Sequence, residues 1–219
     1  MIFIKNCRHR IVKFIFLTLM ATACFVGEAQ KLKTGDLLFV SSGDSSFSQA
    51  IADATASNDS LRFVHVALFY IDDQGKKKII EADPEEGVRI ADFSDFIEEN
   101  GRSEGKGGII VKRLNFSFPV DSAVQRAKNH IGEPYDWSYL PDNGKMYCSE
   151  LIEDIFRDEN GEKIFRSAPM NFLNPDGTLP EFWKNLFEKL GEQVPQGVDG
   201  TNPTDLSKDT RLVEIYRFF

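Results

Sequence analysis

The stretch that most restricts the possible folds of this chain is Phe63–Ile71, which reads FVHVALFYI. β-Branched and aromatic residues fill it, and such residues favour strands over helices. A polar turn, Asp72–Gly75, follows directly, and Lys77–Ala82 is a second run with strand character. Two strands joined by a short turn pair in antiparallel fashion. The sequence therefore predicts a β-hairpin, with His65 on the same face of its strand as apolar residues.

The remaining segments alternate between strand and helix patterns, and no internal repeat or linker separates two domains. Helices are expected at Ser45–Ala56, Asp92–Asn100, Asp121–Ile131, from Cys148 onward and from Pro180 onward. Further strands are expected at Gly35–Val40, Ile109–Leu114 and Arg211–Phe218, and Gln193–Asp209 is expected to be a polar surface loop. Together these elements predict an α+β domain in which an antiparallel sheet packs against helices.

The N-terminus has the pattern of a secretory signal peptide. Basic residues up to Lys13 precede an apolar run, Phe14–Val26, which is too short to span a bilayer comfortably. Small residues at Gly27 and Ala29 predict cleavage after Ala29, so that residues 1–29 are removed. Residues 30–219 then form a single domain, which we expect to be exported across the inner membrane into the periplasm. The alternative is a lipoprotein attached to the membrane through Cys24.

Charge and cysteine content exclude several classes of protein. The net charge of −8 argues against nucleic-acid binding, which requires a basic face. Three cysteines are too few for a disulfide scaffold. Two of them, Cys7 and Cys24, lie in the N-terminal segment, so the exported domain keeps Cys148 alone. A buried structural role and a nucleophilic role both remain open for a single cysteine.

The position of Cys148 favours the nucleophilic role. It lies in the first turn of its expected helix, on the same face as Leu151, Ile152 and Ile155. Unpaired backbone N–H groups give a helix start a partial positive charge, which favours a thiolate and can stabilise a developing oxyanion. The preceding aromatic loop offers the walls of a substrate groove. Tyr147, Tyr135 and Trp137 are accordingly the candidate substrate-binding residues.

A nucleophilic cysteine needs a base and a group that orients it. His65 and His130 are the histidines of the exported part, and His130 lies at a helix end where it can simply stabilise that helix. Glu81 lies on the strand that pairs with the His65 strand, within apolar neighbours, and is preferred over Asp83 as the orienting acid. A zinc site formed by His65, Glu81 and Cys148 is a further alternative. No other metal or cofactor motif is present.

Five short motifs in this order resemble the permuted papain-like amidases of the NlpC/P60 superfamily, often called the YiiX/YaeF-like group. They are Gly35–Phe39, His65–Leu68, Ile80–Ala82, Gly132–Asp136 and Tyr147–Leu151. The resemblance implies a circularly permuted papain-like fold in which the histidine and the acid precede the cysteine along the chain. It also implies that His65, Glu81 and Cys148 form the catalytic triad.

From these residues we expect a cysteine hydrolase, an exported amidase or peptidase (a thiol protease in the broad sense). It would cleave an amide bond through a Cys148 thioester, with a cell-wall peptide or another small amide as substrate. Two alternatives stay open. One is an acyltransferase or lipid hydrolase similar to lecithin:retinol acyltransferase, and the other is a non-catalytic binding domain.

Overall fold

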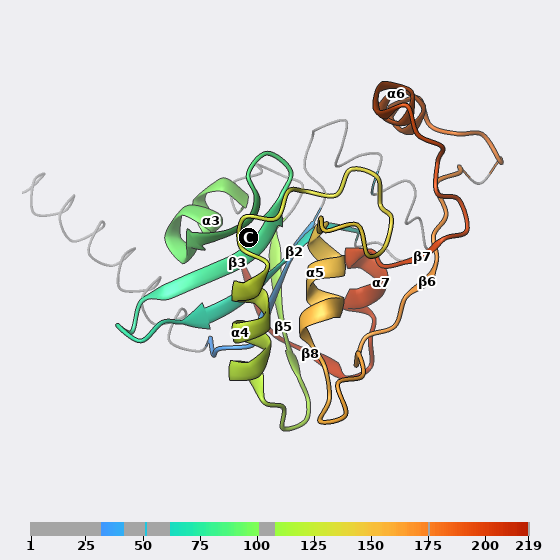
Figure 1. Ribbon diagram of the computed structural model, residues 1–219. Coiled ribbons are helices and arrows are strands. Elements are labelled where there is room, and N and C mark those ends of the chain that lie inside the picture. The colour runs from blue at the N-terminus through green and yellow to red at the C-terminus, as the bar shows by residue number, and fades with distance from the viewer. Residues whose placement is uncertain (1–31, 42–50, 52–61, 101–107, 175, 219) are drawn as a thin grey trace, which may run out of the picture. The chain divides into compact units, whose positions relative to one another are not determined.

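The computed structural model describes residues 32–41, 51, 62–100, 108–174 and 176–218, and Thr34–Phe219 forms one compact unit. The centre of this unit is a six-stranded sheet in the order β4-β3-β2-β1-β5-β8, in which neighbouring strands are antiparallel (Figure 1). The strands are β1 (Leu37–Ser41), β2 (Phe63–Ile71), β3 (Lys77–Asp83), β4 (Gly87–Asp92), β5 (Ile109–Leu114) and β8 (Leu212–Phe218). The predicted α+β class with an antiparallel sheet is confirmed.

Helices cover both faces of this sheet. The helices are α3 (Phe93–Asn100), α4 (Val120–Asn129), α5 (Cys148–Ile155), α6 (Glu181–Leu190) and α7 (Pro203–Ser207). Helices α4, α5 and α7 share one hydrophobic core with the face of the sheet that carries Phe39, Val66 and Ile110. Helix α3 lies against the opposite face, where Phe93 meets Phe69 with ring centroids 5.2 Å apart.

The central strands are buried on both faces because of this double covering. Leu37, Leu38 and Phe39 in β1 are fully buried, which explains why the strand reads as a continuous apolar run without alternation. The hairpin predicted from the sequence is formed by β2 and β3, with Leu68 opposite Ile80 and Ile71 opposite Lys77. Residues with odd numbers on both strands share the face that α3 covers, so His65 and Glu81 lie on the same side of the sheet.

The C-terminal part of the chain is more ordered than its composition suggests. The expectation of a surface loop at Gln193–Asp209 is wrong, because this segment contains strand β7 (Asp199–Gly200) and helix α7. Strand β7 pairs with β6 (Ala168–Pro169) (Figure 1). This pairing joins the two ends of the chain segment that contains α6. Polar composition misleads here because α7 buries Thr204, Leu206 and Ser207 through a few well-placed contacts.

The turn after β3 leads into another strand of the sheet. Pro84 and Gly87 predict only the end of the second hairpin strand, whereas Gly87 begins β4, which continues the sheet. The expected helix at Ser45–Ala56 and the signal peptide at residues 1–29 lie outside the described residues, apart from Ile51 in the helix. In the described part of the chain, no helix combines the length and the apolar character needed to cross a membrane.

Candidate active site

Helix α5 places the sulfur of Cys148 at its first turn, as its apolar spacing predicts. Tyr147 is the N-cap residue in an extended conformation, and Cys148 itself is buried. The carboxyl of Glu150 accepts the backbone N–H of Tyr147 at 3.3 Å, which ties the chain to the start of the helix. Burial raises the pKa of Glu150 to about 8, and the neighbouring Asp136 and Glu153 add to this effect. Its burial therefore favours the protonated form of Glu150 near neutral pH.

A β-bulge lies at the start of β2, just before His65. Val40 pairs with His65, whereas the next residue, Ser41, pairs with Phe63, so that Val64 is the extra residue on β2. Such bulges interrupt the pairing of the two strands locally. The ladder between β2 and β3 starts at Leu68, so His65 lies beyond it, where the imidazole has room to turn toward neighbouring elements.

The imidazole of His65 connects Glu81 to Cys148. Its Nε2 lies 2.7 Å from Oε2 of Glu81, and Cys148 is the other side chain close enough to raise the pKa of the ring. Since Nε2 is engaged by the carboxylate, Nδ1 is the nitrogen left to face the thiol. Burial lowers the pKa of His65, but the hydrogen bonds to Cys148 and Glu81 and the negative charges of both groups outweigh it and raise this pKa to about 10. The arrangement thus stabilises an imidazolium at neutral pH.

Glu81 is the buried acid of this site, with 3% of its side chain exposed. Burial raises its pKa, but the hydrogen bond and charge of His65, followed by those of Arg89, bring this pKa below its ordinary value. Asp83 has another role: its carboxylate accepts the backbone N–H groups of Glu85 and Glu86 at 2.8 and 2.9 Å and caps the turn. The structure therefore places Glu81, and not Asp83, against His65.

His130 lies apart from these residues. Its Nδ1 is 3.0 Å from Glu133 and its Nε2 is 3.2 Å from Asp154, so both ring nitrogens are engaged between α4 and α5. It has the structural role that its position at a helix end suggests, and the site has His65 as its candidate base.

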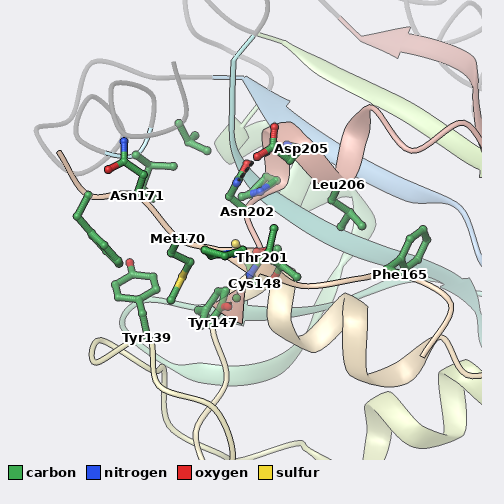
Figure 2. A pocket seen from close by; sticks show the side chains of 18 of the residues that line it. Tyr139, Tyr147, Cys148, Phe165, Met170, Asn171, Thr201, Asn202, Asp205 and Leu206 are labelled. Carbon is green, nitrogen blue, oxygen red and sulfur yellow. Dashed lines mark hydrogen bonds between the residues drawn. The ribbon is translucent and has the colours of Figure 1, made fainter. Parts of the chain in front are cut away.

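Cys148 borders a pocket of about 590 Å³ (Figure 2). Tyr135 and Tyr147 line it, whereas Trp137 is not among the described residues that do so. The ring of Trp137 packs instead beside Tyr135, with centroids 4.9 Å apart. That these three residues bind substrate stays a prediction.

Much of the pocket wall comes from residues that the sequence did not single out. The segment between β6 and β7, which contains α6, contributes Met170, Phe172 and Trp183. The segment around α7 contributes Thr201 and Leu206. Figure 2 shows Cys148 between Met170 on one side and Leu206 on the other. Of these residues, Trp183 carried a signal in the sequence, because the helix expected from Pro180 onward places it with apolar residues at helical spacing.

A hydrogen bond also joins the C-terminal segment to the residue before α5. The hydroxyl of Tyr147 accepts the backbone N–H of Thr201 at 3.0 Å. Next to it, Gly200 allows a close approach: a Cβ there would lie 2.5 Å from Sδ of Met170 and 2.9 Å from the Tyr147 hydroxyl. The pocket wall is thus packed directly onto the residue that precedes Cys148.

The donor groups of the site do not fit a resident metal ion. Across the described ranges, no group of three or more His, Cys, Asp or Glu side chains is arranged to hold one. One oxygen of Glu81 is hydrogen-bonded directly to His65, and the other faces the guanidinium of Arg89 at 2.9 Å. A cation at this carboxylate would have to displace the arginine, so the alternative of a zinc site formed by His65, Glu81 and Cys148 does not fit these contacts.

The chain is similar to known proteins in both sequence and fold. The chain is 26% identical over 184 residues to the uncharacterized protein YiiX of Escherichia coli K12, covering 83% of each chain. The fold is similar to a crystal structure described as that of the metalloprotein yiiX from Escherichia coli O157:H7, with a TM-score of 0.67 and 22% identity, covering 84% of this chain and 97% of that one. A sequence model of the permuted papain-like amidases, the YaeF/YiiX or C92 family, matches residues 31–216. With its mixed helix and antiparallel-sheet architecture, the chain belongs to this family of permuted papain-like amidases.

Proposed function

We propose that this protein is an exported cysteine amidase or peptidase that hydrolyses an amide bond through a thioester on Cys148. The observation that carries the proposal is the hydrogen bond of His65 to Glu81 together with the nearness of His65 to Cys148, which itself borders a pocket. A nucleophile, a base and an orienting acid in this sequence of contacts are what cysteine hydrolysis requires. The family of permuted papain-like amidases supports amidase or peptidase activity in general.

The reaction follows from the contacts of these three residues. The Cys148 thiolate attacks the amide carbonyl and forms a C–S bond, while the negative charge moves to oxygen, near the backbone N–H at the start of α5. Collapse of this intermediate breaks the C–N bond, and Nδ1 of the His65 imidazolium gives its proton to the departing amine. Nδ1 then takes a proton from water, the hydroxide attacks the thioester, and the acid leaves with restoration of the thiolate–imidazolium pair. Glu81 holds the ring throughout.

The pocket supports a substrate with a bulky apolar part. Its volume of about 590 Å³ lies within the range for small-molecule sites. Aromatic rings of Tyr139, Phe172 and Trp183 pack edge to face along its wall, at centroid distances of 5.1 to 5.9 Å. An amide with an apolar substituent beside the scissile bond fits such a wall, and a cell-wall peptide or another small amide is the substrate class that we propose.

Thiol labelling tests this proposal without knowledge of the substrate. In the full chain with Cys7 and Cys24 replaced by serine, Cys148 is expected to react with iodoacetamide at neutral pH at least about tenfold faster than a small free thiol. His65→Ala should remove this advantage while the fold persists. A wild-type rate equal to that of the free thiol would refute the enzymatic proposal and favour the non-catalytic alternative.

The metal dependence of the same reaction is a useful control. The structural neighbour is described as a metalloprotein. Because both oxygens of Glu81 have protein partners, we expect equal labelling rates before and after dialysis against EDTA. A rate that depends on added metal would contradict the assignment of Glu81 to His65.

Acyl transfer is the second candidate, favoured by the apolar wall next to Cys148. A wall of this kind suits an acyl chain and keeps water away from a thioester. Incubation with matched peptide and lipid acyl donors, followed by mass analysis of Cys148, separates the two. A thioester that persists until an alcohol or amine is added supports transfer, whereas prompt release of free acid supports hydrolysis.

For the N-terminus we propose removal of residues 1–29 during export, which leaves Gln30 at the start of a periplasmic protein. The mass of the protein recovered from the periplasm tests this directly. Retention in the membrane with a lipid on Cys24 would instead establish the lipoprotein alternative.

A further inference from the structure

Arg89 on β4 completes a row of three polar side chains that leads to Cys148. It lies directly opposite Glu81 in the register between β3 and β4. Its Nε donates to Oε1 of Glu81 at 3.0 Å, and its Nη2 lies 2.9 Å from the same oxygen. The other oxygen, Oε2, is 2.7 Å from Nε2 of His65. The two oxygens of one carboxylate are thus divided between the guanidinium and the imidazole.

This division matters because Glu81 is buried. A buried carboxylate needs charged or hydrogen-bonding partners, or it takes up a proton and loses its charge. The terminal torsion of a glutamate is also broad, so a single partner does not fix the plane of its carboxylate. The planar guanidinium of Arg89 provides both the positive charge and a fixed direction. His65 gains and loses a proton in the proposed reaction, so it does not give Glu81 a constant positive charge or a fixed direction.

Arg89 is itself held from several sides. Its Nη1 lies 3.0 Å from Glu86 in the turn before β4, and its Nη2 lies 3.4 Å from Asp83 and 3.7 Å from Glu99 on α3. These three carboxylates are far more exposed than Glu81, which is the buried partner of the set. The guanidinium is therefore anchored by the surface groups and directs its other edge toward the interior.

We infer that Arg89 is a positioning residue for the proposed reaction: it keeps Glu81 charged and oriented so that His65 stays aimed at Cys148. The inference rests on the proposed function, since it assigns Arg89 a task in the same site. Arg89 does not touch Cys148 or the pocket and acts through the carboxylate. Loss of its charge allows Glu81 to take up a proton at higher pH, and a protonated Glu81 no longer holds the imidazolium.

The experiment uses the full chain with Cys7 and Cys24 replaced by serine and measures the iodoacetamide rate of Cys148 from about pH 4 to about pH 9. For Arg89→Gln we expect a rate about fivefold lower than wild type near pH 4 and within about twofold near pH 8, with the acid limb of the profile moved up by about one pH unit. Arg89→Lys keeps the positive charge but lacks the planar pair of N–H donors of the guanidinium. Its pH profile should therefore lie between those of the wild type and Arg89→Gln.

Arg113 offers a matched control. Its Nε and Nη2 donate to the two oxygens of Asp36 at 2.6 and 2.8 Å, and Asp36 is fully buried. Arg113→Gln therefore removes a comparable arginine–carboxylate pair away from the site. We expect it to lower stability while leaving the pH profile of Cys148 labelling as in the wild type.

Three outcomes overturn the inference: a folded Arg89→Gln variant with the wild-type profile, a uniform slowing at every pH, or an equal change in Arg113→Gln. If Arg89→Gln does not fold, Arg89→Lys is tested by the same criteria. Failure of the proposed function looks different, because then wild-type Cys148 shows no advantage over a free thiol and His65→Ala changes nothing.

Discussion

At the residue scale, Glu81 and Asp83 show how position decides the role of a carboxylate. They are two residues apart on β3 and share a face of the strand. Glu81 is buried and reaches His65, whereas Asp83 lies at the strand end and caps the next turn. The sequence offers both as partners for the imidazole, and the contacts separate them.

Paired substitutions test this separation. Glu81→Gln removes the charge that stabilises the imidazolium, so the labelling rate of Cys148 at neutral pH should fall at least about tenfold. Asp83→Asn keeps an oxygen for the turn and should stay within about twofold of wild type. Both rates are measured with iodoacetamide, and equal effects of the two changes would contradict the assignment of Glu81.

The protonation of His65 is a second property of a single residue. Because its pKa is raised to about 10, the imidazolium is present below that pH and is lost only above it. The NMR signals of its ring should therefore not titrate between about pH 5.5 and pH 8, where an ordinary histidine does. In Cys148→Ser or Glu81→Gln the titration should move down into this range, and a wild-type midpoint near pH 6.5 would contradict the contact pattern.

At the element scale, helix α7 fixes the start of β2. The hydroxyl of Thr204 accepts the backbone N–H of Phe63 at 3.0 Å and donates to its carbonyl at 3.1 Å. Phe63 is two residues before His65 and lies next to the bulge at the start of β2. A helix near the C-terminus thus holds the backbone that presents the candidate base.

Substitutions of two buried hydroxyl residues of α7 distinguish an effect on His65 from a general loss of stability. Thr204→Val should lower the free energy of unfolding by about 2 kcal/mol, because it leaves two backbone groups of Phe63 without a partner. Ser207 donates to the Thr204 carbonyl at 2.7 Å within the same helix. Ser207→Ala should also destabilise, but only Thr204→Val should slow Cys148 labelling. Urea titration and the iodoacetamide rate measure the two effects, and equal labelling rates would refute the role of α7.

Helices α4 and α5 are joined by His130 and its two carboxylates. The hydrogen bond to Asp154 raises the pKa of His130, burial lowers it, and Glu133 adds to the increase. In turn, the hydrogen bond to His130 lowers the pKa of Asp154 to about 2, with burial opposing it and Arg157 assisting. This linkage makes the contact between the two helices dependent on pH.

The sign of this dependence follows from the direction of each shift. The contribution of His130 is present below its unfolded pKa of about 6.5 and is lost as the pH rises through the raised folded pKa. That of Asp154 is present above about pH 4 and is lost as the pH falls toward about 2. Compared with wild type, His130→Gln should be less stable by about 1 kcal/mol near pH 6, with a smaller difference near pH 9. Urea titrations at both pH values measure it, and a constant difference would contradict the linkage.

At the scale of the whole molecule, local patterns predicted the framework well. The hairpin, the helix that begins at Cys148 and the central strand β1 follow from periodicity and from turn residues, which act over a few positions. His65, Glu81 and Cys148 could be chosen because each is a polar group in an apolar pattern, and the structure brings them together. Their roles in catalysis remain predictions.

The parts that escaped prediction depend on contacts between distant segments. Pro84 and Gly87 indicate a turn after β3 but not the further strand, β4, that begins at Gly87. The sequence therefore does not indicate that Arg89 lies opposite Glu81. Helix α7 is hidden by polar composition, although its hydroxyl meets a strand much earlier in the chain. Pairing across such a separation has no signature in a local window of sequence.

The uninterrupted meander β2–β3–β4 carries His65, Glu81 and Arg89, whereas Cys148 belongs to a helix encoded much later. During synthesis, the residues of the acid–base half of the site are therefore translated well before the nucleophile. The two blocks meet only through packing, so their order along the gene does not affect how they fit. Moving the chain ends to another loop would exchange this order and leave the same chemistry in place.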